Sequence, residues 1–354
     1  MRPSFKKFVM GIAISIAACF ACSSLLANTF AQTSVLTSDN VGVVVNDLDP
    51  MSIAIGEYYQ KVRGITTHNI FHVKLPVGVP GISKTEFFAA KIAVDLRAGP
   101  QIQVLALAWN APYRVECMSI TTAFTMGFDQ QFCSTPCKPT RASPYFASNS
   151  RHPYDDLGIR PTIMLAASSL TEAKALIDRG LQADNSFPIG AAYLLNTSDK
   201  ARSVRSLFFP RAKLASRGRV AINAVEADFI ENRTDVLFYF TGSIQVAKLD
   251  TLGFLPGALA DHLTSYGGQL TDSPHMSILR WIDAGATGSY GTVQEPCAFL
   301  QKFPNPLLVM DNYLSGDTLI EAYWKSVQWP GEGVFIGDPL AAPFRSSGGS
   351  KSQH

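Results

Sequence analysis

Three short apolar runs alternate with two helix starts in the first third of the chain, and this alternation is the strongest constraint on its fold. The runs cover residues 41–46, 69–75 and 102–109 and are rich in large or β-branched apolar residues, as are strands buried on both faces of a sheet. Between them, Asp49 and Ser83 can cap two helices. This strand–helix–strand–helix–strand order predicts a parallel sheet with helical crossovers.

The same alternation returns in the second part of the chain. Strands are expected at residues 189–195, 220–224, 235–240 and 333–337, and helices at residues 170–181, 256–263, 277–283 and 318–327. The whole pattern predicts an α/β fold, with helices on both faces of a layered, mostly parallel sheet.

Composition divides the chain into five segments. We expect a signal peptide at 1–31, a first α/β lobe at 32–134, a Pro/Ser-rich connection or flap at 135–165, a second α/β lobe at 166–345 and a disordered tail at 346–354. Basic residues precede the apolar run 8–27, and the small residues Thr29 and Ala31 suit a signal peptidase. An uncleaved anchor and lipoprotein processing at Cys19 are the alternatives.

The charge balance argues against nucleic acid as a partner. Thirty basic residues face 28 acidic ones, and without Arg2, Lys6 and Lys7 of the predicted signal 27 face 28, a net charge of −1. Nucleic-acid-binding domains carry a strong positive excess instead. Residues 78–85 miss a phosphate-binding loop by one glycine, which Ser83 replaces, so no nucleotide or other cofactor is expected. After the signal, no apolar run is long enough for a stable transmembrane segment.

Export would place the cysteines in an oxidising compartment. Cys117, Cys133, Cys137 and Cys297 remain after removal of the signal, and this even number favours disulfides, with three alternative pairings. Cys133 and Cys137 stand in the order Cys-Ser-Thr-Pro-Cys, but no second close pair of Cys or His completes a zinc site. We therefore predict disulfides and no metal.

The densest polar cluster lies between residues 260 and 268. Asp261, His262 and Ser265 precede Gly267 and Gly268, and we expect them at the end of a helix and in the turn after it. The histidine is either a core residue, held by an acid or a backbone group, or a group that carries protons in a site.

Glu295 and Cys297 form a second cluster after a glycine-rich segment. Ligands of α/β sheets bind beyond the carboxyl ends of strands, where such clusters lie. Cys297 is either paired or buried, or it is a thiolate that His262 activates, as in cysteine hydrolases. In the second case Asp261 or Glu295 is the orienting acid.

Motifs spread over nearly the whole mature chain carry a family resemblance. They are Val44-Val-Asn46 with Asp49-Pro50 and Tyr58-Tyr59, Tyr113-Arg-Val-Glu-Cys117, Ala260-Asp-His-Leu-Thr-Ser265 with Gly267-Gly268, Gly285-Ala-Thr-Gly-Ser-Tyr-Gly-Thr-Val293 with Glu295-Pro-Cys297, and Glu321-Ala-Tyr-Trp324 with Ile336-Gly-Asp-Pro-Leu340. On these motifs the chain resembles an uncharacterised family of secreted bacterial proteins that co-occurs with the exosortase sorting system. The resemblance implies export and a surface-related role, and it implies no reaction.

The second lobe is more distantly similar to gingipain-like cysteine peptidases of the caspase-like fold. It shares their order of strand, glycine turn, helix, Gly-Ala-rich strand and closing Gly-Asp-Pro. Those enzymes carry His-Gly after one strand and the catalytic Cys after the next. Here Thr241-Gly242 and Ser265 stand at these places, so the resemblance implies a degenerate site.

These observations together predict a caspase-like or flavodoxin-like fold in an exported protein of the periplasm or the cell surface. We expect a non-catalytic or degenerate peptidase-like module that binds a polypeptide or an envelope component. Its crevice would lie near Thr241, His262, Ser265 and Glu295, with Gly267 and Gly268 beside them. The alternative is an active cysteine hydrolase or peptidase built on His262 and Cys297.

Overall fold

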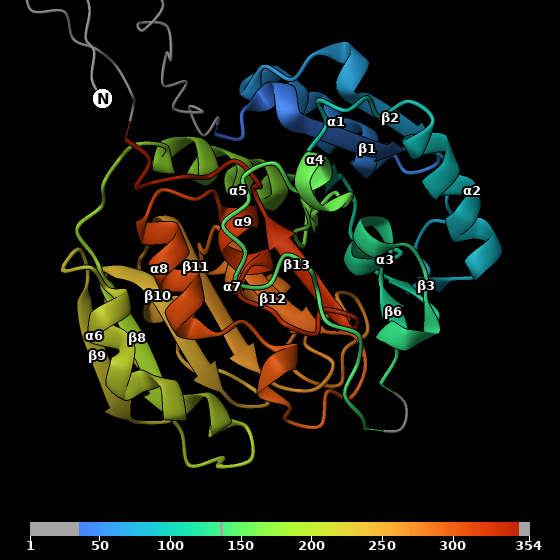
Figure 1. Ribbon diagram of the computed structural model, residues 1–354. Coiled ribbons are helices and arrows are strands. Elements are labelled where there is room, and N and C mark those ends of the chain that lie inside the picture. Colours follow the sequence, from blue (N-terminus) through green and yellow to red (C-terminus); the bar gives the residue numbers. More distant parts are fainter. Residues whose placement is uncertain (1–34, 135–136, 347–354) are drawn as a thin grey trace, which may run out of the picture. The chain divides into compact units, whose positions relative to one another are not determined.

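One ten-stranded sheet forms the centre of the computed structural model, which describes residues 35–134 and 137–346 (Figure 1). In spatial order its strands are β2 (Ile70–Val73), β1 (Val41–Asn46), β4 (Val104–Leu107), β7 (Thr162–Met164), β13 (Gly333–Gly337), β12 (Gly288–Thr292), β11 (Phe254–Leu263), β10 (Val236–Gly242), β8 (Ala191–Asn196) and β9 (Ala221–Glu226). A small second sheet contains β3 (Gly81–Ile82), β5 (Arg114–Val115) and β6 (Met118–Ser119).

Strand β13 joins two halves of the large sheet that run in opposite directions. On one side, β2, β1, β4, β7 and β13 pair in parallel. On the other side, β12 is antiparallel to β13, while β12, β11, β10, β8 and β9 are parallel to one another. The carboxyl ends of β8 to β12 therefore meet at one edge of the sheet, and those of β1, β2, β4 and β7 meet at the opposite edge.

Helices pack on both faces of this sheet, as predicted. The α-helices are α1 (Pro50–Arg63), α2 (Lys84–Asp95), α3 (Ile120–Met126), α4 (Pro153–Leu157), α5 (Leu170–Ala183), α6 (Ala212–Ala215), α7 (Leu279–Asp283), α8 (Pro306–Leu314) and α9 (Leu319–Trp324). The 3₁₀ helices are Ser38–Asn40, Thr67–Asn69, Gln130–Phe132, Ser203–Arg211, Leu249–Thr251 and Leu300–Lys302. In β11, Asp261 contacts Arg205 of a 3₁₀ helix, whereas its neighbour His262 contacts Trp281 of α7. Because neighbouring strand residues point to opposite faces, these two helices cover opposite faces.

The sequence signals for two helix starts and for two strands are confirmed. Asp49 caps α1 by accepting a hydrogen bond from the backbone N–H of Met51, 2.9 Å away. Ser83 and Glu86 form a reciprocal capping box at α2. The apolar runs 41–46 and 333–337 form β1 and β13 with the predicted bounds.

One predicted helix is wrong, because residues 254–263 form strand β11. The Pro256-Gly257 pair begins no helix, and Gly257 has a φ of +88°. The pairing register of β11 with β10 shifts at this place, where Phe254 and Leu259 pair with two residues of β10 that are only two positions apart. Pro and Gly therefore mark an irregularity in a strand, and His262 lies inside the sheet.

The predicted division of the chain into segments stays a prediction. Strands from 32–134 and from 166–345 belong to the same sheet, and β7 comes from the predicted connection. Residues 1–31 and the tail after Ser346 lie outside the described residues. Within the described part of the chain, no helix is both long and apolar enough to cross a bilayer.

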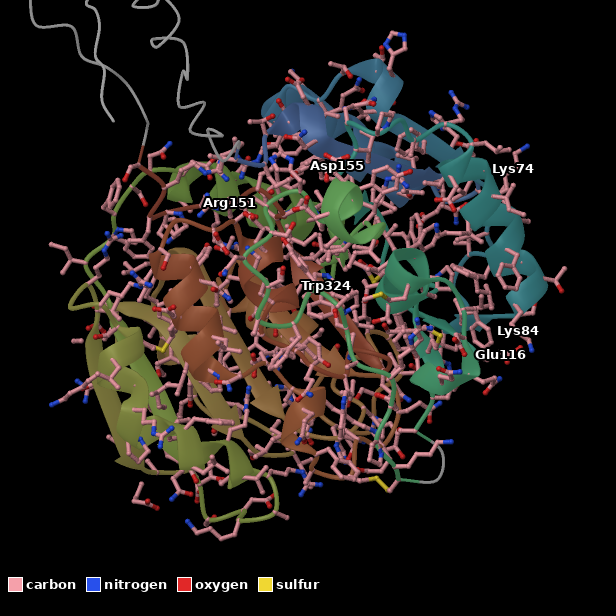
Figure 2. All side chains as sticks on the ribbon, in the orientation of Figure 1. Lys74, Lys84, Glu116, Arg151, Asp155 and Trp324 are labelled. Atoms are coloured by element: carbon pink, nitrogen blue, oxygen red, sulfur yellow. A yellow bond between two sulfur atoms is a disulfide. The ribbon has the colours of Figure 1, made fainter. Side chains whose placement is uncertain are left out.

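Strand β13 is held by contacts to elements on both sides. Trp324 of α9, labelled in Figure 2, stacks on Phe335 of β13, with ring centroids 4.4 Å apart. Its indole N–H donates to the carbonyl of Thr162 in β7. Directly after β13, the buried carboxylate of Asp338 accepts hydrogen bonds from Tyr59 and Arg63 of α1. Burial raises the pKa of Asp338, and the positive charge of Arg63 opposes this shift.

We predict that Asp338→Ala lowers the free energy of unfolding by about 3–5 kcal/mol, because Arg63 would keep a buried charge without its main partner. The matched control is Asp95→Ala, which breaks the exposed pair with Lys91 and should cost no more than about 0.5 kcal/mol. Urea unfolding with the disulfides intact measures both. Equal effects of the two variants would show that the buried pair does not stabilise the fold.

Candidate functional site

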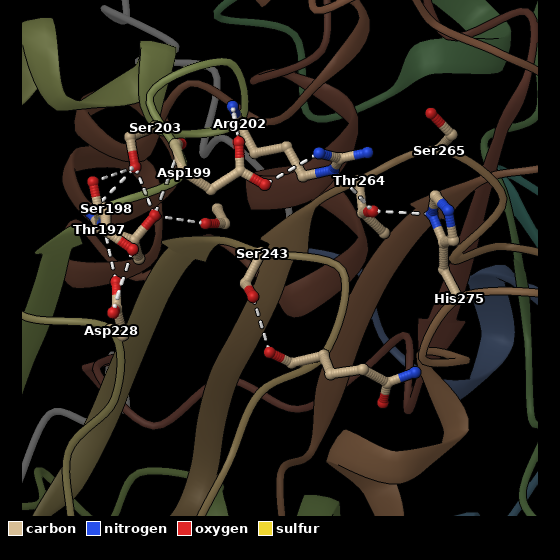
Figure 3. A network of polar contacts seen from close by, with 12 residues as sticks. Thr197, Ser198, Asp199, Arg202, Ser203, Asp228, Ser243, Thr264, Ser265 and His275 are labelled. Atoms are coloured by element: carbon tan, nitrogen blue, oxygen red, sulfur yellow. Dashed lines mark hydrogen bonds and ion pairs between the residues drawn. The ribbon is translucent and has the colours of Figure 1, made fainter.

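The candidate site lies where the carboxyl ends of β8, β10, β11 and β12 meet. The loops that follow β8, β9, β10 and β11 bring together a network of polar side chains (Figure 3). Beside this network lies a cavity of about 170 Å³. Its lining residues are Ala201, Arg202, Leu263, Thr264, Ser265, Glu295, Pro296, Cys297 and Ala298.

Arg202 links the loops that follow β8 and β11. Its Nη1 donates to Asp199 over 2.8 Å, and its Nε donates to Oγ1 of Thr264 over 3.2 Å. The Thr264 hydroxyl also lies 2.8 Å from Nδ1 of His275. The remaining nitrogen, Nη2, has no hydrogen bond to the residues that the structure describes, and in Figure 3 it points away from Asp199, toward the side of Ser265. The cavity therefore offers a hydrogen-bond donor with a positive charge.

Glu295 ties the loop after β12 to the end of β11. Its Oε2 accepts a short hydrogen bond from the Ser265 hydroxyl, and its Oε1 accepts one from the backbone N–H of Cys297, 2.8 Å away. Cys297 and Ala298 have φ angles of +58° and +53°, a left-handed backbone that costs about 1–2 kcal/mol for each residue with a side chain. The hydrogen bonds of Glu295 help to hold this loop, and both of its carboxylate oxygens are occupied.

The four cysteines in the described part of the chain form two disulfides, which confirms that prediction and selects one of the three pairings. Cys117 is bonded to Cys133, and Cys137 is bonded to Cys297 across 160 residues. The second bond fixes the segment at Cys137 beside the cavity. While this bond is intact, Cys297 has no thiolate.

His262 is a core residue with both ring nitrogens in use. Its side chain is buried, Nδ1 accepts a hydrogen bond from the indole of Trp281 over 2.9 Å, and Nε2 lies 3.1 Å from the carbonyl of Met276. Burial lowers the pKa of His262 to about 3, and the nearby charge of Arg205 acts in the same direction. The imidazole is therefore neutral, and in this arrangement the pair of His262 and Cys297 has neither a free base nor a thiolate.

Asp261 and Thr241 also lie in the interior. Asp261 forms a buried ion pair with Arg205, whose Nη1 is 2.5 Å from Oδ1. Burial raises the pKa of Asp261 to about 6, although the charge of Arg205 opposes the shift. Thr241 is buried, and its hydroxyl has no hydrogen-bond partner among the described residues. Neither residue lines the cavity.

Gly267 and Gly268, which were predicted as site residues, lie in a closely packed contact between backbone segments. A Cβ atom at Gly268 would lie 2.4 Å from the carbonyl oxygen of Gly291, and one at Gly291 would lie 2.6 Å from the backbone of Gly267. Only glycine lets the loop after β11 approach β12 this closely. Of the predicted site residues, the structure thus gathers Ser265, Glu295 and Cys297 around one cavity.

The segment after β8 fills the crevice between β8 and β10. A Cβ atom at Gly242 would lie 2.0 Å from the carbonyl oxygen of Arg202. Thr197 donates to the carbonyl of Gly242 over 2.6 Å, and Arg205 donates to that of Thr241 over 2.8 Å. This crevice is the switch point of the strand order, where ligands of open α/β sheets commonly bind. Because it is filled, the cavity beside Arg202 lies at the ends of β11 and β12 instead.

Sequence reasoning missed Asp199, Arg202 and His275. An acid and an arginine three residues apart, directly after the strand that ends at Asn196, are a weak signal for this network. Among the described residues, no three His, Cys, Asp or Glu side chains gather as metal ligands do.

Comparison with known proteins gives one distant structural likeness. No protein-family model matches this chain, and no curated protein matches it. A solved structure named "Structure of Protease" is similar over 88% of this chain and 80% of that chain, with 12% sequence identity and a TM-score of 0.45.

We predict that His262 makes the protein sensitive to mild acid. The unfolded chain protonates this residue below about pH 6.5, whereas the folded protein does so only near pH 3. Acidification from about pH 6.5 to about pH 4.5 therefore removes up to about 1.4 kcal/mol of stability per pH unit through this residue.

Urea unfolding at several pH values measures this effect. In His262→Gln the loss of stability per pH unit should be smaller than in the wild type, and in the exposed control His68→Gln it should be unchanged. Parallel curves for His262→Gln and the wild type would show that His262 takes up protons freely in the folded protein.

Proposed function

We propose that the protein is an exported, non-catalytic module, similar to peptidases, that binds a polypeptide or another envelope component at the cavity beside β11 and β12. One observation carries the proposal: the cavity contains a cation with a free donor, Arg202, whereas the predicted pair of His262 and Cys297 has neither a free base nor a thiolate. Cys297 is bonded to Cys137, and His262 is buried between Trp281 and Met276.

The size of the cavity favours one group of a larger ligand. Its volume of about 170 Å³ is below the roughly 300–1,000 Å³ of pockets that enclose a drug-sized molecule. One side chain or one chain terminus fits such a space. A guanidinium group recognises carboxylate oxygens by charge-assisted hydrogen bonds, so we expect the bound group to be a carboxylate of an otherwise exposed polypeptide.

Residues at the carboxyl ends of β10 and β11 support the proposal that the peptidase-like site is degenerate. The resemblance to gingipain-like peptidases places their histidine at Thr241-Gly242, and here the backbone of Arg202 packs against Gly242. It places their cysteine near Ser265, whose hydroxyl is bound to Glu295. Two disulfides support export, since such bonds persist in oxidising compartments. A periplasmic or cell-surface location, with processing by signal peptidase or as a lipoprotein at Cys19, belongs to the same proposal.

The alternative function is an active cysteine hydrolase that uses His262 and Cys297. It would require reduction of the bond between Cys137 and Cys297. It would also require release of His262 from the hydrogen bonds to Trp281 and Met276. Non-catalytic binding requires neither change.

Equilibrium dialysis against short random-sequence peptides with free carboxyl termini tests the binding proposal. We expect Arg202→Gln to weaken retention by about tenfold or more, because a hydrogen bond to a charged group contributes about 1.5–3 kcal/mol. Arg280→Gln is the matched control, since Arg280 is exposed on α7 and does not line the cavity. Equal retention of peptide by the wild type and by Arg202→Gln would show that this cavity is not the binding site.

Mass spectrometry of the same peptides tests the proposal that the protein is non-catalytic. We expect all peptides to stay intact, both with and without a reductant in the buffer. Cleavage that appears only with reductant, and disappears in Cys297→Ser, would establish the hydrolase alternative.

A further inference from the structure

Strand β9 is an open edge of the large sheet. It pairs in parallel with β8 through all six residues, from Ala221 to Glu226. No described segment pairs with its other side, and its residues are exposed or half-buried. Figure 1 shows β9 at the outer margin of the sheet.

The hydrogen-bonding groups that β9 leaves free follow from its pairing. Ala221 donates its N–H to the carbonyl of Gly190, beside β8. In a parallel ladder, every second residue directs both backbone groups to the same neighbour. The N–H and C=O groups of Ile222, Ala224 and Glu226 therefore point away from the sheet. These groups can pair with one more strand.

Nothing in the middle of β9 protects this edge. Natural edges avoid pairing through lysine, proline, bulges or very short strands, whereas the residues Ala221-Ile-Asn-Ala-Val225 are uncharged and paired in regular register. The other edge strand, β2, is only four residues long and carries His72, whose Nδ1 is 2.6 Å from Asp47. The contrast indicates that β9 has a partner.

Charge at the two ends of β9 indicates which partner fits. Exposed Arg217 and Arg219 precede the strand, and exposed Glu226 and Asp228 stand at its other end. Arg217 is paired with Asp311 and Glu226 with Lys200. Arg219 and Asp228 have no ion pair among the described residues, so each end of the strand keeps one charge for a partner. When two copies of β9 pair antiparallel, the arginine end of each lies beside the acidic end of the other, so the edge is complementary to itself. A second copy also covers apolar surface at Val225 and Phe229, each 39% exposed.

We propose that two copies of this chain form a dimer by antiparallel pairing of their β9 strands, which joins two ten-stranded sheets into one. The inference does not depend on the proposed function of the cavity, which lies at the ends of β11 and β12. The partner of this edge is a second copy of the chain because β9 and its flanking residues supply both the free backbone groups and the two complementary charges.

Analytical ultracentrifugation over a range of protein concentrations tests the proposal. We expect the wild type to be a dimer that weakens as salt is added, because ion pairs at the strand ends are screened. Ala224→Pro removes an outward N–H and should raise the dissociation constant more than about tenfold, while an edge strand tolerates proline. The matched control Ala224→Thr keeps the N–H and should keep the dimer, and thermal unfolding confirms that both variants fold.

Charge reversal adds an independent test of the antiparallel arrangement. Arg219→Glu and Asp228→Arg should each weaken self-association, whereas an equimolar mixture of the two variants should associate again, because each then offers ends complementary to the other. A monomeric wild type at all concentrations would overturn the proposal, as would a dimer that Ala224→Pro leaves unchanged. A mixture that stays monomeric would overturn the antiparallel pairing.

Discussion

Strand β13 is the element on which the architecture depends, because it is parallel to β7 and antiparallel to β12. Phe335 of this strand stacks on Trp324, and the carboxylate of Asp338 directly after it is held by α1. These contacts merge two parallel half-sheets into one sheet. The antiparallel pairing of β12 with β13 reverses the direction of the second half, so that the loops after β8, β10, β11 and β12 gather at one edge. The position of the cavity follows from this reversal.

The chemistry of the cavity follows from how those loops are fastened. The segment after β8 fills the crevice at Gly242 and brings Arg202 to the end of β11. Glu295 and the disulfide to Cys137 hold the loop after β12 in place. Glu295 and Cys297, two of the predicted site residues, are thus used to hold the loops together. What remains accessible is a guanidinium donor in a small cavity with both polar and apolar lining residues, which suits recognition of an oxyanion.

Much of the fold could be predicted because its signals are local. A β-branched run such as 41–46 is apolar on both sides, and a cap such as Ser83 with Glu86 acts within one helical turn. Strand β11 was predicted as a helix because Pro256-Gly257 looks like a helix start and because Asp261 and His262 are polar. Their burial is offset by Arg205 and Trp281, which are distant in sequence, and no local pattern reveals such partners.

The site could be predicted only in part, for the same reason. Ser265, Glu295 and Cys297 belong to clusters that follow strands, so the sequence indicated their common edge. The choice of Cys137 as the partner of Cys297 depends on a contact between segments 160 residues apart. The network of Asp199, Arg202 and His275 also joins separate loops. Proximity of this kind is a property of the sheet order, which motifs do not encode.

Disulfide mapping of protein purified without reductant measures the state of the cavity most directly. Free thiols are first blocked with iodoacetamide, and the protein is then digested and analysed by mass spectrometry. We expect a peptide that joins Cys137 to Cys297 and no alkylated Cys297. A fully alkylated Cys297 in protein whose bond between Cys117 and Cys133 is intact would contradict the claim that this cavity binds its ligand without a nucleophile.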